Sequence, residues 1–134
     1  MYFNSRKSAD RPDKTGGFFA ILLKTTETFS KETQVIKRMV MWKLKDSHEG
    51  MSKDELIAKF KQKVEGLKSA VPEIKTMELG KSFSELPVAY DVALYSEFDS
   101  KEDYEVFLKH SEHVKVGKFI RQIRTDVALV EYET

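Results

Sequence analysis

Cysteine is absent from this chain of 134 residues, and its absence removes several classes of chemistry at once. The chain forms no disulfide, holds no zinc or iron–sulfur cluster through thiolates and has no cysteine nucleophile. Histidine is scarce as well, with three residues in the chain. Since a catalytic zinc normally takes three protein ligands, we predict no metal site.

No sign of charge dominates either, because 23 lysines and arginines are balanced by 22 aspartates and glutamates, for a net charge of +1. Positive and negative residues are mixed along the whole chain, so the sequence shows no cluster of basic residues that could neutralise several phosphates. Nucleic acid is therefore excluded as an expected partner. No apolar run approaches the ~20 residues that a membrane helix needs, and we expect neither a membrane association nor a membrane span.

The longest apolar run, residues 16–23 (GGFFAILL), follows several basic residues, an order that superficially resembles a signal peptide. Lys24 ends the run, Asp10 and Asp13 interrupt the basic region, and no small-residue cleavage pattern follows. We therefore interpret residues 1–34 as an N-terminal extension that is poorly ordered or packs as an arm. We expect a cytoplasmic protein.

Apolar residues make up 40% of the chain and charged residues 34%, the balance of a globular protein with one core. We assign that core to residues 35–134. Residues 35–45 (VIKRMVMWKLK) place apolar side chains on both faces at period two, which predicts a strand buried on both sides. Ser52 and Glu55 have the spacing of a capping box and predict a helix over residues 53–70, which Pro72 ends.

Two further strands and a helix follow. Residues 73–83 and 88–98 read as strands joined by the turn SELP, and so short a connection predicts an antiparallel hairpin. Ser100 begins a second helix that runs to His110, Gly117 permits a bend, and KFIRQI forms a short helical or irregular turn. A last strand covers residues 124–133.

The order strand, helix, strand, strand, helix, strand predicts an α+β, ferredoxin-like βαββαβ protomer with a four-stranded antiparallel sheet. Helices cover one face of such a sheet, yet these strands carry apolar residues on both faces. An uncovered apolar face is an association surface. We therefore predict a homodimer in which two sheets face one another and close a central β-barrel.

Four segments together resemble the Dabb family, the stress-responsive dimeric α/β-barrel domain: residues 36–46 (IKRMVMWKLKD), 71–83 (VPEIKTMELGKSF), 89–113 (AYDVALYSEFDSKEDYEVFLKHSEH) and 126–133 (DVALVEYE). The resemblance covers residues 35–134. It implies a ferredoxin-like protomer, a homodimer with a central barrel, and a cleft between sheet and helices that accepts a small organic molecule in some members. It also implies an association with stress response.

The resemblance places the residues of a plant polyketide cyclase of this family at Arg38, Val92, Phe107 and His113, where the cyclase has two strand histidines, a tyrosine and a histidine. Three of these four positions are changed, and Ser111 stands in place of the proline in the family's His-Pro-x-His motif. Valine and phenylalanine have no exchangeable proton and arginine stays charged. The cyclase's proton transfer therefore does not carry over.

His113 is the one titratable cyclase position that remains, and an imidazole in an apolar cleft is able to act as a general base. The alternative is that His113 bonds the backbone at the helix boundary and packs against its neighbours. For His110 we expect a structural role, capping the carbonyls that end the helix. His48 follows the first strand, and we expect it in solvent. Haem would require an axial ligand such as His113; we predict no cofactor.

Arg38 and Tyr90 have two interpretations. In the first, both side chains bind the oxygens of an anionic or phenolic ligand. In the second, Arg38 pairs with Asp91 and Tyr90 packs in the core. Trp42 and Phe107 are core or barrel residues that also serve as pocket walls.

Two functions follow. The first is a protein of the stress-response type that binds a small apolar or aromatic molecule without catalysis. The alternative is a cofactor-independent cyclase, isomerase or monooxygenase acting on an enolisable aromatic or polyketide-like substrate, with His113 as base and Arg38 or Tyr90 orienting oxygen.

Overall fold

A computed structural model describes residues 34–134, so the predicted N-terminal extension, with its apolar run, lies outside the described residues except for Gln34. The elements, in chain order, are β1 (Ile36–Leu44), β2 (Ser47–His48), β3 (Met51–Ser52), α3 (Lys53–Ala70), β4 (Ile74–Lys81), β5 (Val92–Phe98), α4 (Lys101–Lys109), α5 (Ser111–Ile123) and β6 (Arg124–Glu133). The predicted order of the long elements is confirmed. The two-residue strands β2 and β3 form a small added hairpin.

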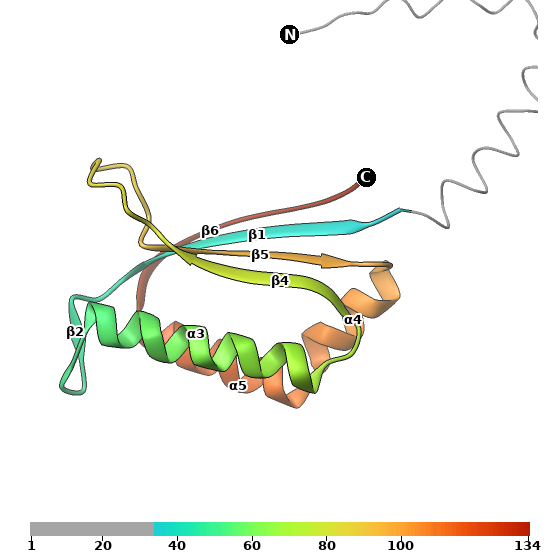
Figure 1. Ribbon diagram of the computed structural model, residues 1–134, viewed down its shortest axis with the longest axis horizontal. Helices are drawn as coiled ribbons and strands as arrows, with labels where there is room; N and C mark the ends of the chain where they lie inside the picture. The colour runs from blue at the N-terminus through green and yellow to red at the C-terminus, as the bar shows by residue number, and fades with distance from the viewer. Residues whose placement is uncertain (1–33) are drawn as a thin grey trace, which may run out of the picture. The chain divides into compact units, whose positions relative to one another are not determined.

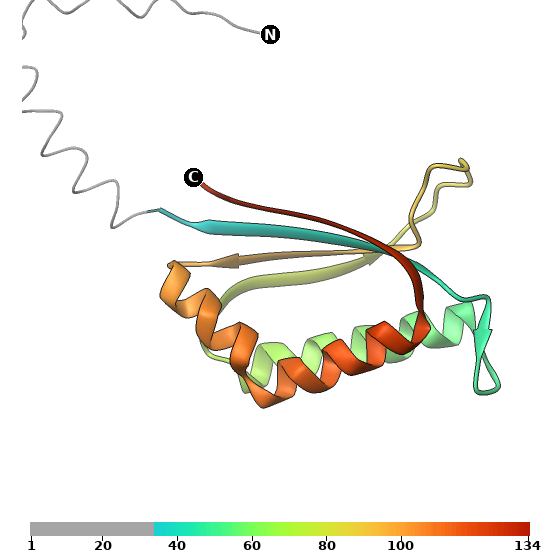
Figure 2. The same cartoon turned by 180° about the vertical axis from the view of Figure 1, so that it is seen from behind.

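Four strands pair in the order β4-β5-β1-β6, all antiparallel, with the helices on one face of the sheet (Figure 1). The reverse view shows α5 running beside α3 beneath the same face (Figure 2). The ferredoxin-like α+β fold and the β4–β5 hairpin are thus confirmed. The first and last strands lie side by side because the order of helices and strands brings the chain back to β1.

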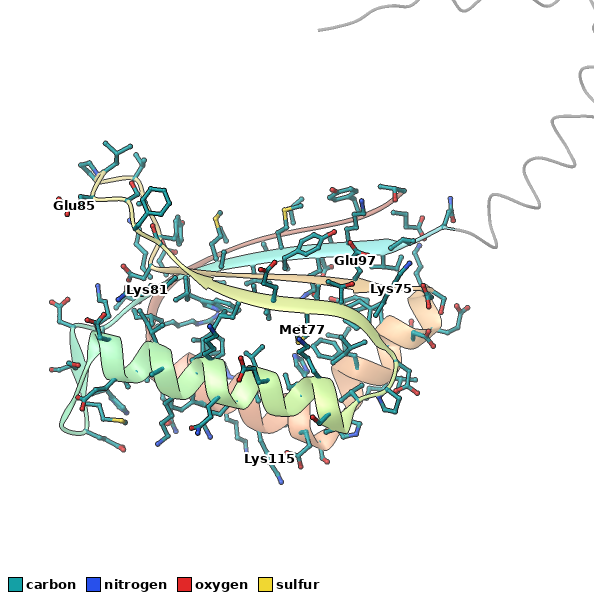
Figure 3. All side chains as sticks on the ribbon, in the orientation of Figure 1. Lys75, Met77, Lys81, Glu85, Glu97 and Lys115 are labelled. Carbon is teal, nitrogen blue, oxygen red and sulfur yellow. The ribbon has the colours of Figure 1, made fainter. Side chains whose placement is uncertain are left out.

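Alternate residues of β1 face the helices. Ile36, Val40 and Trp42 are each at most 6% exposed, whereas Met39 and Met41 on the other face are 37% and 41% exposed. The same division holds across the sheet: Met77 of β4 points toward the helices and Glu97 of β5 points away (Figure 3). The strand predicted to be buried on both sides therefore buries one face within the described protomer.

Helix α3 begins as predicted. The Ser52 hydroxyl accepts from the Glu55 N–H at 3.2 Å, and the Glu55 carboxylate accepts from the Ser52 N–H at 2.9 Å, which completes the capping box. Its apolar stripe is buried against the sheet, and each such side chain contributes about 2 kcal/mol of hydrophobic free energy. The stripe consists of Leu56, Phe60, Val64 and Leu67.

The predicted hairpin turn was too short. Strand β4 ends at Lys81 and β5 begins at Val92, so residues 82–91 form a loop that rises on the side of the sheet away from the helices (Figure 1). Phe83, Leu86 and Val88 in this loop are 98%, 67% and 77% exposed. Pro87 is part of the same loop, and proline interrupts a ladder of sheet hydrogen bonds.

The second helical region also differs from the prediction. The helical conformation is interrupted at His110, whose extended backbone (φ −65°, ψ 136°) separates α4 from α5. Helix α5 then runs unbroken through Gly117 to Ile123, so the bend expected at Gly117 is absent. Residues 118–123, expected as a short helical or irregular turn, are helical and form the last part of α5. A glycine costs a helix about 1 kcal/mol relative to alanine, which tertiary packing readily offsets.

Candidate functional site

A cavity of about 310 Å³ lies between the sheet and the helices. Strands β1, β5 and β6 form one wall, and α3, α4 and α5 form the other. Most of the lining is apolar and comes from residues such as Val40, Trp42, Phe60, Leu94, Phe107 and Ile120. This is the composition and the lower end of the size range of sites that bind small organic molecules.

The structure brings four of the five predicted site residues together in this cavity: Arg38, Trp42, Phe107 and His113. Tyr90 is the exception. Its hydroxyl donates to Asp126 at 3.3 Å, and the Lys43 ammonium lies 5.1 Å from its ring centroid. Tyr90 belongs to the loop that precedes β5, so the alternation that directs strand side chains toward the helices does not apply to it.

His113 makes the backbone contact and the ring packing expected of its structural alternative, and it also lines the cavity. The His113 Nδ1 lies 3.2 Å from the Leu108 carbonyl oxygen, and the centroids of the His113 and Phe107 rings are 4.2 Å apart. Because the carbonyl only accepts, the neutral imidazole carries its proton on Nδ1 and keeps Nε2 as a lone-pair base. Burial lowers the pKa of His113, and the nearby charges of Arg38 and Arg121 lower it further, against the Leu108 hydrogen bond. The ring is therefore neutral at pH 7.

His110 is a cap, as predicted, but of the opposite kind. Its Nδ1 accepts from the Glu112 N–H at 3.1 Å and so caps the start of α5 instead of the carbonyls that end α4. The two histidines thus satisfy backbone groups on either side of one helix break.

Arg38 pairs with Glu131, at 3.0 Å from Nε to the carboxylate, and not with Asp91. The predicted Arg38–Asp91 pair is wrong because the β1–β5 register places Ser96 opposite Arg38 and Val92 opposite Trp42, so that Asp91 lies toward the other end of β1. The Asp91 carboxylate accepts from the Leu44 N–H at 2.7 Å and lies 3.2 Å from Lys53 Nζ. Glu131 stands directly opposite Arg38 in the β1–β6 ladder. That pairing is visible in the sequence once the first and last strands are taken as neighbours.

Arg121 and Arg124 also line the cavity, and sequence reasoning missed them. His113, Gly117 and Arg121 recur at steps of four, which places them on one face of a helix. That signal was hidden as long as a bend was expected at Gly117. In the folded chain a Cβ at Gly117 would lie 3.3 Å from Nη1 of Arg121, so the guanidinium lies back along α5 over the glycine.

Within residues 34–134, no three His, Asp or Glu side chains cluster so as to hold a metal ion. His48 was expected in solvent, but its side chain is 23% exposed and its Nε2 lies 3.5 Å from Glu49. No helix in the described part of the chain is long and apolar enough to cross a membrane.

The sequence model of the stress-responsive A/B barrel domain, Dabb, matches residues 36–134. The chain belongs to the Dabb family. A dimeric ferredoxin-like protein of unknown function from Bacteroides fragilis is 31% identical, with a TM-score of 0.66, over 75% of this Dabb chain and 96% of its own. No curated protein matches the chain.

Two other solved structures share the fold of this Dabb protein. Hydroxynitrile lyase from Passiflora edulis is 16% identical, with a TM-score of 0.65, over 76% of this chain and 94% of the lyase. A Dabb family protein from Mesorhizobium loti is 21% identical, with a TM-score of 0.56, over 74% of this chain and 95% of its own. At these identities the likeness concerns the fold alone.

Proposed function

We propose that this protein holds a small apolar or aromatic molecule in the cavity beside His113. The observation that carries the proposal is the cavity itself: about 310 Å³ between sheet and helices, walled mainly by apolar side chains, with one neutral imidazole at its edge. We further propose, from the family's description, a role in stress response in the cytoplasm, with residues 35–134 as the functional domain and residues 1–34 as an extension.

The assembly we propose is a homodimer closed through the uncovered face of the sheet, which would form a central β-barrel. On that face Val130 is 51% and Tyr132 42% exposed, beside Met39 and Met41. The exposed apolar loop of residues 82–91 rises on the same side. A second copy of the sheet would cover these side chains. The Bacteroides fragilis relative and others of the same fold are described as dimeric.

Naphthalene, a neutral aromatic hydrocarbon, tests the ligand proposal, because Trp42 lines the cavity and is the chain's one tryptophan. We expect naphthalene to change the Trp42 fluorescence of the full chain saturably. Val116→Phe, which fills the cavity from α5, should abolish the change. The matched control Val114→Phe alters an exposed residue of the same helix and should preserve it. A Trp42 signal that is insensitive to naphthalene, or equally sensitive in Val116→Phe, contradicts the proposal.

A second candidate function is cofactor-independent general-base catalysis on an enolisable substrate. It is favoured by the hydrogen bond that fixes the His113 tautomer, which leaves Nε2 free to take a proton from carbon. The C–H bond would break, its electron pair would move into the enolate, and the proton would pass to Nε2. Arg38 would face the enolate oxygen as a cation. Tyr90, placed outside the cavity, has no part in this version.

Deuterium exchange at the methyl group of acetophenone in heavy water measures this step. A general base predicts exchange well above the buffer rate, lost in His113→Gln, while naphthalene binding persists. If the wild-type chain and His113→Gln exchange the methyl group at the same rate, the catalytic candidate fails and the binding proposal is unaffected.

A further inference from the structure

The cavity has a cationic side that the proposed function does not explain. Arg38, Arg121 and Arg124 all line it, and no aspartate or glutamate does. Arg38 is matched by Glu131. For Arg121 and Arg124, residues 34–134 supply no carboxylate within ion-pair distance. The guanidinium groups of Arg121, an exposed residue, and of the half-buried Arg124 thus remain at one wall of a mainly apolar space.

The position of Arg121 argues against a purely helix-stabilising role. Basic residues are common near the C-terminus of a helix, because the dipole favours them beside the last carbonyls. The Arg121 guanidinium instead lies back over Gly117, one turn toward the start of α5. A side chain on residue 117 would crowd it. The glycine therefore gives the charged end of Arg121 room along the cavity wall.

Arg124 approaches the same cavity from a different element. It is the first residue of β6 and the C-cap of α5, and it is half-buried. Partly buried cations are stable when an anion pairs with them. Two planar guanidinium forks are suited to bind a carboxylate with directed, charge-assisted hydrogen bonds.

We propose that Arg121 and Arg124 bind the carboxylate of an organic anion whose apolar body fills the cavity against Trp42 and Phe60. The ligand class is a small aryl or acyl monocarboxylate. This inference rests on the proposed function, since it names the chemistry of the molecule in the same cavity. It also relocates the anion site from the expected Arg38 and Tyr90, of which the first is already paired and the second lies elsewhere.

Cinnamate and cinnamamide, nearly equal in shape and different in charge, separate this inference from the proposed function. Both are titrated into the full chain at low ionic strength, with Trp42 fluorescence and calorimetry as readouts. We expect cinnamate to bind at least about tenfold more tightly than the amide, because each charge-assisted bond to the carboxylate is lost in the neutral probe. Added sodium chloride should weaken cinnamate binding and leave cinnamamide binding unchanged.

Arg121→Gln and Arg124→Gln should each lower the cinnamate affinity at least about fivefold without changing the affinity for cinnamamide. Lys118→Gln removes the same charge from an exposed position of α5 outside the cavity lining and serves as the matched control. Equal affinities for the two probes, or equal losses in Lys118→Gln, overturn the inference and leave the proposed function intact. If neither probe binds, the inference and the proposed function fail together.

Discussion

Arg38 and Glu131 join the first and last strands of the sheet, with Arg38 Nε donating to the Glu131 carboxylate at 3.0 Å. The Tyr104 hydroxyl of α4 donates to the same carboxylate oxygen. Glu131, on β6, therefore connects α4 to both strands of the β1–β6 pair. Burial, followed by the hydrogen bond to Glu131, raises the pKa of Tyr104 to about 12.

Glu131→Gln should destabilise the fold by about 1–2 kcal/mol, because the Arg38 side chain, 14% exposed, loses its carboxylate. The pKa of Tyr104 should fall, yet stay above 10, since burial is the larger cause of its elevation. Urea unfolding measures the first effect and an NMR titration of the tyrosine rings the second.

Glu97→Gln is the matched control for that titration. The hydrogen bond from Tyr95 to Glu97 is the largest cause that raises the pKa of Tyr95 to about 12, so this variant should lower the pKa of Tyr95 and leave Tyr104 unchanged. If Tyr104 titrates in Glu131→Gln as it does in the wild-type chain, the hydrogen bond to Glu131 does not raise the pKa of Tyr104.

We expect His113 to make the free energy of unfolding depend on pH. Its pKa is lowered in the folded chain, chiefly by burial, so the unfolded chain binds the proton first as pH falls below about 6.5. The stability that neutral His113 contributes is fully present above the pKa of this residue in the unfolded chain. It is lost as the pH falls through the lower pKa of His113 in the folded chain. Urea unfolding between about pH 8 and about pH 5 should show a steeper loss of stability for the wild-type chain than for His113→Gln. Parallel pH profiles would show that His113 titrates alike in both states.

His110 caps α5 by accepting a hydrogen bond, so its replacements should rank by acceptor ability. His110→Ala should cost about 1 kcal/mol of stability, and His110→Asn should recover most of it, because asparagine is a strong N-cap residue. His110→Lys, which only donates, should be as unstable as the alanine variant. A lysine variant as stable as wild type would restore the original expectation that residue 110 caps the carbonyls of α4.

The uncovered sheet face predicts the assembly. Met41→Glu places a charge at the centre of the proposed interface and should dissociate the dimer in analytical ultracentrifugation. Val114→Glu adds the same charge to α5, at a side chain of similar exposure (45% against 41%), and should stay dimeric. A wild-type chain that sediments as a stable monomer would refute the central-barrel assembly.

The sequence was sufficient for most of the fold. The Ser52–Glu55 capping box, the apolar stripe of α3 and the period-two pattern of β1 are local signals, because each depends on residues within a few positions of one another. The order of these elements predicted the ferredoxin-like arrangement. The resemblance to the Dabb family directed attention to His113 and Phe107, which do line the cavity.

Tertiary structure alone decided the partners and the charges of the site. Arg38 pairs with a residue 93 positions away, and a sheet register that brings β1 beside β6 is needed to choose Glu131 over Asp91. Arg121 and Arg124 reach the cavity because α5 continues through Gly117 and the Arg121 side chain lies back over it. Local patterns fix where helices and strands begin, but the direction of a long charged side chain depends on the space that distant segments leave for it.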